Sequence, residues 1–302
     1  MREEEFLTRG VCGGTLQRTL QMTRWSASAR RTVALLGGIA GGGTAFVGWG
    51  AAQVLIPGLV SPAVGATALN AAALNLCALS AITAVSAVVF EKGAGAVDPW
   101  TALSIGAPAM ACAPLGAIAA RRVAGRTLQI AFHGITVVCM PLQGLSFASR
   151  WRRAERSSGP ARGMAQLWHL DAAPSLRSPE TMRHAGFGTV CGFLSGFLGV
   201  AGLPYVVSYL TYATTLEHNA VVGTTMAAVA PSVVVGALAH CSSGSAPIAL
   251  AAPLMVAAGA GCVVGGSAAL RVPEAALQAL FVATLALASV RSGRTLFVLL
   301  RP

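Results

Sequence analysis

The sequence predicts an all-α, polytopic integral membrane protein with about eight transmembrane helices, arranged as two duplicated four-helix repeats. Three observations lead to this fold class: the scarcity of charge, the length of the charge-free stretches and an internal repeat. Only 10% of the 302 residues are charged and 55% are apolar, whereas about 25% of a typical soluble domain is charged. A soluble fold of this size would lack the charged side chains that cover its surface.

Charge-free stretches are long enough to cross a bilayer. Residues 32–90, 184–216 and 218–270 contain no Asp, Glu, Lys or Arg. A helix crosses with about 20 apolar residues, so the first stretch has room for two crossings. Hydropathy then predicts eight crossings, at 33–60, 66–90, 100–120, 127–148, 185–212, 219–240, 246–270 and 274–291.

The chain begins with a basic tail, residues 1–32, which contains six arginines. Its Ser, Thr and Gln content is similar to that of an organellar transit peptide, but the acidic run 3–5 is unusual because such peptides avoid acids. Two interpretations stay open, a targeting segment and a plain cytoplasmic tail. A secretory signal peptide is not expected, because the first apolar run is too long.

A polar linker separates the two halves of the chain. The first transmembrane repeat is predicted at 33–148 and the second at 185–302, and the linker at 149–184 contains seven arginines and three prolines. Without apolar periodicity, the linker has no core of its own. Basic residues thus gather in the tail, the linker and the C-terminus, as cytoplasmic charge does in a membrane protein. We expect the lipid bilayer as a partner and no nucleic acid.

The two halves match residue by residue when one is shifted along the other. A shift of 151 superposes Gly37, Gly41, Thr44, Ala45 and Gly48 on Gly188, Gly192, Ser195, Gly196 and Gly199. A shift of 149 superposes Arg122, Val123, Leu128, Gln129 and Phe132 on Arg271, Val272, Leu277, Gln278 and Phe281. Four crossings per half would return the chain to its starting side, so the repeats are predicted to be parallel.

The distribution of Lys and Arg predicts the orientation. With four crossings per half, both termini and the linker lie on one side, which collects 17 basic residues against four on the other. The positive-inside rule then places both termini and the linker in the cytoplasm. The plasma membrane is the expected location, and an organellar membrane is the alternative.

A glycine row opens each half and shares one helix face, which predicts close helix packing. The run 48–53 (G-W-G-A-A-Q) follows the first row, and the run 199–204 (G-V-A-G-L-P) follows the second. Such runs break a helix, and broken helices at matching positions of two repeats point to a transporter's binding site. Backbone N–H groups at the start of a half-helix favour an anion. The candidate substrate-binding residues are therefore Gly48, Gly50, Gln53, Gly199 and Gly202.

The run G-F-L-S-G-F-L-G-V-A-G-L-P at 192–204, followed by N-A-V-V-G-T-T at 219–225, resembles the sulfite exporter TauE/SafE family of membrane transporters. The stretches 115–123 and 264–273 resemble the helix ends that close each half of that family. The resemblance covers about residues 33–147 and 185–295. It implies a secondary transporter, and probable export, of small anions such as sulfite, sulfonates or related sulfur-containing anions. It adds Thr224 and Thr225 as candidates, and Asn70 lies near the matching place in the first half.

Departures from the family pattern fall at the candidate site. The family's triple glycine is replaced by G-A-A at 50–52 and by A-G-L at 201–203. The resemblance therefore predicts the fold more strongly than it predicts which anion is bound. A membrane structural or assembly protein that retains the transporter fold without transport is the alternative function.

The sequence lacks the motifs of other functional classes. The spans contain no nucleophile with a base and no H-E-x-x-H, so no enzyme is expected, and no Walker motif is present. The seven cysteines have no C-x-x-C spacing, which predicts small buried hydrophobes without a disulfide framework or a metal site. No cofactor is expected. The transport direction, the coupling ion and the oligomeric state are left open.

Two further polar residues have more than one interpretation. Asn75 lies in an apolar segment, and a buried amide needs partners. It is either bonded between helices or in contact with a ligand. Glu217 stands at the start of the predicted sixth crossing and is interpreted as a helix cap, because an acid there favours the helix dipole.

Overall fold

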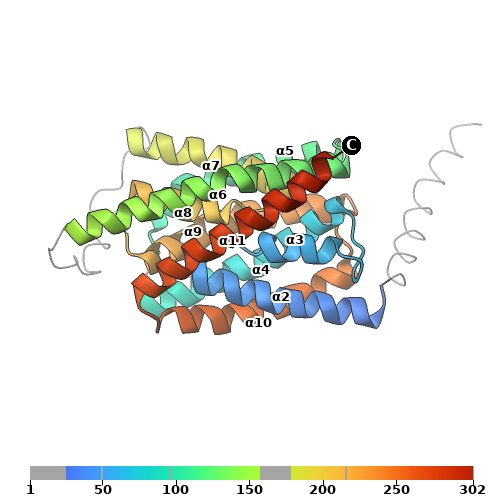
Figure 1. The fold of residues 1–302 in the computed structure, drawn as a ribbon, viewed down its shortest axis with the longest axis horizontal. Helices are drawn as coiled ribbons and strands as arrows, with labels where there is room; N and C mark the ends of the chain where they lie inside the picture. The colour runs from blue at the N-terminus through green and yellow to red at the C-terminus, as the bar shows by residue number, and fades with distance from the viewer. Residues whose placement is uncertain (1–24, 49, 96, 157–177, 215, 302) are drawn as a thin grey trace, which may run out of the picture.

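The computed structural model describes residues 25–48, 50–95, 97–156, 178–214 and 216–301 (Figure 1). Most of the basic tail and of the polar linker lies outside these ranges. Within them the chain forms ten helices and no strand. The helices are α2 (Ala27–Val47), α3 (Ala52–Val60), α4 (Ala68–Ala94), α5 (Pro99–Arg121), α6 (Gly125–Arg156), α7 (Pro179–Leu198), α8 (Leu203–Ala213), α9 (His218–Ser242), α10 (Ile248–Ala269) and α11 (Glu274–Leu300).

The all-helical class predicted from composition is confirmed. Five helices, α4, α5, α9, α10 and α11, are long and apolar enough to cross a membrane. Large apolar side chains face outward, and Leu35, Val256 and Val264 are 70%, 75% and 71% exposed. Exposure of such an apolar surface to water is unfavourable, whereas lipid chains would cover it. The exposed surface therefore agrees with a multi-pass membrane protein.

The segment predicted as the first crossing, 33–60, is a hairpin of two helices. α2 ends at Gly48, where a left-handed φ of 83° turns the chain into the nine-residue helix α3. The two helices are antiparallel, since a Cβ atom placed at Gly58 would lie 2.8 Å from Leu36 Cδ1. A nine-residue helix spans about 14 Å, less than half of the hydrocarbon core. The prediction of a single crossing here is therefore wrong.

The segment predicted as the fifth crossing, 185–212, is a second hairpin. α7 ends at a left-handed glycine, and the eleven-residue helix α8 folds back along it. The rings of Phe187 and Tyr209 stack with their centroids 4.2 Å apart. The shift of 151 carries Leu36 and Gly58 onto these two residues. Both halves therefore open with the same fold.

The glycine rows pack the first helix of each half against a helix of the other half. A Cβ atom at Gly37 of α2 would lie 2.7 Å from the carbonyl oxygen of Leu254 on α10. On α7 and α5, Cβ atoms at three glycines would overlap backbone carbonyl oxygens, namely Gly188 on Ile105, Gly192 on Ala109 and Gly196 on Ala113. The prediction that these glycines allow close helix packing is confirmed.

Two packed helices run in the same direction when the residue numbers of both increase together along their contact. α2, α4 and α10 share one direction, with contacts between Gly37 and Leu254, Gly41 and Ala258, Val85 and Gly259, and Val89 and Gly266. α5, α7 and α9 share a direction, with contacts between Gly188 and Ile105, Gly196 and Ala113, Gly106 and Ala228, and Gly236 and Ala113. The chain reverses between α4 and α5, since the start of α4 contacts the end of α9 at Cys77 and Cys241, and the start of α5 contacts the start of α9 at Asp98 and Thr224.

The first helices of the two halves, α2 and α7, therefore run in opposite directions. The prediction of parallel repeats is wrong, because each half contains one returning hairpin and three long helices instead of four crossings. α6 ends and α7 begins at the end of the bundle opposite to the start of α2 and the end of α11 (Figure 1). The prediction that the linker shares a side with both termini is wrong for the same reason.

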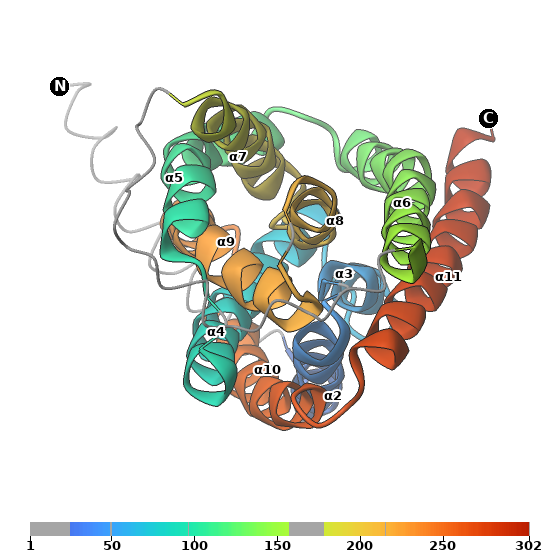
Figure 2. The ribbon, with the colours of Figure 1, turned by 90° about the vertical axis from the view of Figure 1, so that its left-hand side faces the viewer.

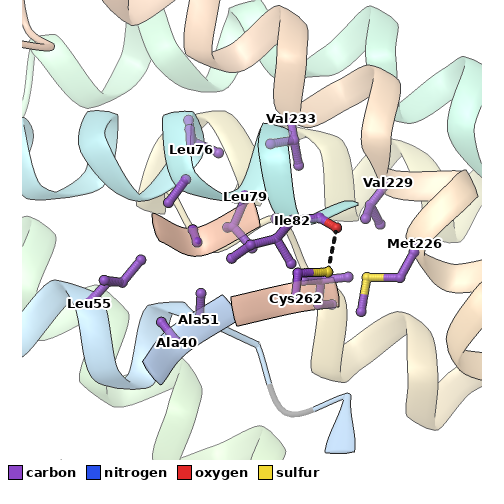
Figure 3. Close-up of a cluster of buried hydrophobic side chains, with 14 of the residues drawn as sticks. Ala40, Ala51, Leu55, Leu76, Leu79, Ile82, Met226, Val229, Val233 and Cys262 are labelled. Carbon is purple, nitrogen blue, oxygen red and sulfur yellow. Dashed lines mark hydrogen bonds between the residues drawn. The ribbon is translucent and has the colours of Figure 1, made fainter. Parts of the chain in front are cut away.

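α4 and α9 form the centre of the bundle and are the most buried of the five candidate spans. Their apolar side chains pack into one cluster (Figure 3), with Leu76, Leu79 and Ile82 from α4 and Met226, Val229 and Val233 from α9. The thiol of Cys262 on α10 donates to the carbonyl oxygen of Ile82 over 3.4 Å. This cluster joins helices of both halves into one core.

The start of α9 is capped from another helix. Glu217 occupies the cap position, but its side chain makes no capping hydrogen bond. The backbone N–H of His218 donates instead to Glu274 Oε1 at the start of α11, over 3.0 Å. The predicted position of Glu217 is confirmed, and the carboxylate that accepts the hydrogen bond belongs to Glu274.

Candidate functional site

The two hairpins meet at their turns. A Cβ atom placed at Gly50 would lie 3.2 Å from Pro204 Cδ, so the start of α3 touches the start of α8. Both starts are inside the protein, since Ala51, Ala52 and Leu203 are at most 1% exposed. Figure 2 shows α3 and α8 within the ring of longer helices. The structure therefore brings together the broken segments that the sequence singles out.

Four predicted glycines form the two turns. Gly48, Gly50, Gly199 and Gly202 have φ angles of 83°, 87°, 71° and 68°, a region that glycine enters without a steric penalty. Among the described residues, Ala201 is the only non-glycine with a positive φ, at 59°. A left-handed alanine costs about 1–2 kcal/mol, and such strain persists where the surroundings determine the backbone, often at functional sites.

The starts of the two half-helices have no side-chain caps. α3 begins after Ala51 and α8 after Gly202, and neither residue makes a side-chain hydrogen bond to the first turn. α2, α4, α5 and α7 begin with capping side chains, from Ser26, Thr67, Asp98 and Ser178, whereas α9, α10 and α11 also begin without one. In the first turns of α3 and α8, the N–H groups of Val54 and Tyr205 donate to the carbonyl oxygens of Ala51 and Gly202. Both helix starts are buried and carry the positive end of the helix dipole, which favours an anion between the turns.

The first turn contacts α9 of the other half. Val222 Cγ2 would lie 3.2 Å from a Cβ atom at Gly48. Thr225 follows Val222 by three residues and therefore shares its helix face. Thr225 is fully buried, and its hydroxyl oxygen has no partner. The face of α9 that contacts the first turn therefore includes a predicted site residue with an unused hydrogen-bonding group.

The second turn receives a polar side chain from α4. Asn75 Nδ2 donates a hydrogen bond to the carbonyl oxygen of Gly199, while the fully buried Oδ1 of Asn75 has no partner. The interhelical interpretation of Asn75 is thus confirmed, and its second polar atom remains available. A shift of 150 places Asn75 on Thr225. Sequence comparison of the two halves could have paired them, since the neighbouring shifts are 151 and 149.

Two more buried hydroxyls lie one turn before the left-handed glycines. Thr44 and Ser195 are both fully buried, and neither hydroxyl has a partner. Their backbone carbonyl oxygens accept the N–H groups of Gly48 and Gly199, each over 2.8 Å. They superpose under the shift of 151, but sequence reasoning treated this pair only as a sign of duplication. We add both to the candidate site.

The remaining predicted residues have different surroundings. Gln53 lies in the first turn of α3, and its buried Nε2 has no partner. The hydroxyl oxygen of Thr224 accepts a hydrogen bond from the backbone N–H of Asp98 over 2.9 Å, which joins α9 to the start of α5. Asn70 lines a pocket of about 300 Å³ beside the starts of α2 and α4, with Trp25 and Ser26.

The arrangement suits the binding of a small anion. In the described part of the chain no three His, Cys, Asp or Glu side chains gather as metal ligands. The polar groups around the two turns are hydroxyls, amides and backbone N–H groups, together with the Cys191 thiol beside Gly202 and the His240 ring at Gly196. Such groups hold a small anion without a compensating positive side chain, as half-helix starts do in other membrane transporters.

Comparison with known proteins gives one match. The sequence profile described as sulfite exporter TauE/SafE matches residues 33–292. No curated protein and no solved structure matches the chain. The matched range includes both hairpins and all the candidate residues.

Proposed function

Because the chain belongs to the sulfite exporter TauE/SafE family, we propose that it moves a small sulfur-containing oxyanion, such as sulfite or a small sulfonate, between the two hairpin turns. The observation that carries this proposal is the contact between two buried, uncapped half-helix starts. Their dipoles both favour negative charge. The unpartnered groups of Gln53, Asn75 and Thr225 are the polar contacts available beside them.

The helix arrangement supports two inverted repeats, each with one hairpin and three crossings. α2 packs parallel to α10, and α7 packs parallel to α5. The shifts of 151 and 149 carry one pair onto the other with the order of the two halves exchanged. Inverted repeats with broken helices at the midplane are a common architecture of secondary transporters.

Sulfite flux through purified protein in liposomes tests the proposed function. We expect sulfite to leave loaded vesicles that contain the protein faster than it leaves protein-free vesicles. Chloride flux serves as the control for nonspecific leakage. A folded protein, shown by a cooperative thermal transition, that moves neither sulfite nor a small sulfonate would contradict the transporter and favour the structural alternative.

Variants of two adjacent threonines distinguish a role in substrate binding from a role in helix packing. Thr225→Val removes a hydroxyl without a partner, and a hydrogen bond to a charged group contributes about 1.5–3 kcal/mol. We therefore expect a rise of about tenfold or more in KM for sulfite and an unchanged melting temperature. Thr224→Val removes the acceptor of the Asp98 N–H, so we expect a lower melting temperature. Equal losses of stability in the two variants would contradict the assignment of Thr225 to the site.

We propose that the termini face the cytoplasm, with the plasma membrane as the location. We assigned each Lys and Arg to the end of the bundle at which the nearest helix begins or ends. The end where α2 begins and α11 ends then has twelve basic residues, and the opposite end has nine. This replaces the count of 17 against four, which assumed four crossings per half. The positive-inside rule still favours cytoplasmic termini, by a margin of three. Seven of the ten acidic residues belong to the opposite end.

A further inference from the structure

Two thiols from different halves of the chain lie close together where α4 packs against the last turn of α9. Cys77 Sγ of α4 is 3.9 Å from Cys241 Sγ of α9, although 164 residues separate them along the chain. Both are free cysteines. Sequence spacing did not pair them, because the contact arises only from the packing of α4 on α9.

The pair can be reached from one end of the bundle. Cys241 is half-buried in the last turn of α9, and exposed residues at 242–244 follow it. This is the end at which both termini lie. Cys77, in contrast, is only 4% exposed. A small oxidant therefore meets Cys241 first, and Cys77 is the second thiol within reach.

We propose that Cys77 and Cys241 form a redox-sensitive pair whose disulfide ties the first half of the protein to the second. The oxidant class is a peroxide. The Cys241 thiol loses its proton and the thiolate attacks a peroxide oxygen, giving a sulfenic acid and, from hydrogen peroxide, a hydroxide that takes up that proton to become water. Cys77 then attacks that sulfur, the S–S bond forms, and the sulfenic oxygen leaves as a second water. The two thiols are oxidised by two electrons, and the peroxide is reduced by the same two.

The disulfide would fix helices that hold the second hairpin. Two residues before Cys77, Asn75 donates to the carbonyl oxygen of Gly199. His240, next to Cys241, has its Nε2 3.0 Å from the carbonyl oxygen of Gly196. Both partners lie in the last turn of α7 or directly after it. An S–S bond between α4 and α9 would restrict their relative movement around this turn, and its effect on flux rests on the proposed function.

The test uses the full chain in liposomes, treated with hydrogen peroxide. Mass analysis of peptides is expected to show Cys77 linked to Cys241 with the loss of two hydrogen atoms. Flux of a small sulfonate, measured after the peroxide has been removed, is expected to fall to the level of protein-free vesicles and to return after dithiothreitol. Sulfite is unsuitable in this experiment because it reduces peroxide and cleaves disulfides. Cys241→Ser should abolish the linked peptide and the sensitivity to peroxide. Cys112→Ser should keep both, since Cys112 belongs to neither helix of the pair.

The outcomes separate the two proposals. If the linked peptide is absent in the wild type, the redox pair is wrong whatever the flux. If the linked peptide forms and the flux does not change, the pair exists but the restriction of movement is wrong. If untreated protein shows no flux, the proposed transport is contradicted, and the peptide analysis still decides whether the thiols pair. Cys77→Ala supplies a second variant should Cys241→Ser fold poorly.

Discussion

Replacing Gly196 by alanine is expected to destabilise the bundle severely. A Cβ atom at this position would overlap the carbonyl oxygen of Ala113 and would lie 2.8 Å from the backbone nitrogen of Ala117. Both are backbone atoms of α5, so no side chain can rotate away. α5 and α7 would have to separate along their whole contact, and overpacking of a rigid core costs about 1–3 kcal/mol or more. The thermal transition of the purified protein measures the loss.

Gly186→Ala is the matched control on the same helix. No atom lies within 4 Å of a Cβ at this position. Alanine is also about 1 kcal/mol more favourable than glycine inside a helix. We therefore expect a melting temperature equal to or above that of the wild type. Similar transitions for Gly186→Ala and Gly196→Ala would show that α5 and α7 do not pack as closely as the structure has them.

Cysteines placed at opposite ends of the bundle are expected to react from opposite sides of the membrane. Glu180 is exposed at the start of α7, and Arg122 is exposed after the end of α5. The direction of the helices puts these two residues at different ends. In a variant without native cysteines, a membrane-impermeant thiol reagent added to intact cells should label Glu180→Cys. It should label Arg122→Cys only after the membrane is opened.

Two other labelling results would contradict different parts of this expectation. Labelling of both cysteines from outside would contradict the inverted arrangement, since an even number of crossings would then separate them. Labelling of Arg122→Cys alone would keep the arrangement and reverse the orientation in the membrane. Expression and trafficking of each variant can be followed with an epitope tag at the C-terminus.

The class of the protein could be predicted from sequence because membrane burial acts on composition over long stretches. Charge-free runs such as 218–270 are long enough to cross a bilayer. The matching glycine spacing of the two halves was also visible, because helix packing restricts the size of residues at fixed spacing. Gly37, Gly41, Gly188 and Gly192 are small because carbonyl groups of the partner helix lie against them.

The hairpins could not be predicted from hydropathy. An apolar segment of 28 residues at 33–60 has the same hydropathy whether it crosses once or turns back at Gly48. The glycine cluster indicated a break in the helix, but not the direction of the chain after it. That one difference changes the parity of each half, and with it the direction of α7 and the side of the linker.

The contacts of the polar site residues could not be predicted. Asn75 donates to the carbonyl oxygen of Gly199, a turn residue of the opposite half, so no pattern within one half indicates this partner. Thr224 and Thr225 are adjacent and chemically identical, and only the packed structure shows that one accepts a hydrogen bond from Asp98 and the other has no partner.

Because the first helix of each half packs against a helix of the other half, the two first helices meet their partners at different times during synthesis. When α7 leaves the ribosome, its partner α5 is already in the membrane. α2 has no such partner, because α10 follows it by about 200 residues, which is roughly 10–40 s of translation. For that interval the glycine face of α2 has no helix to pack against, so the insertion machinery or lipid must cover it. Slow codons between the halves would therefore harm the first hairpin more than the second.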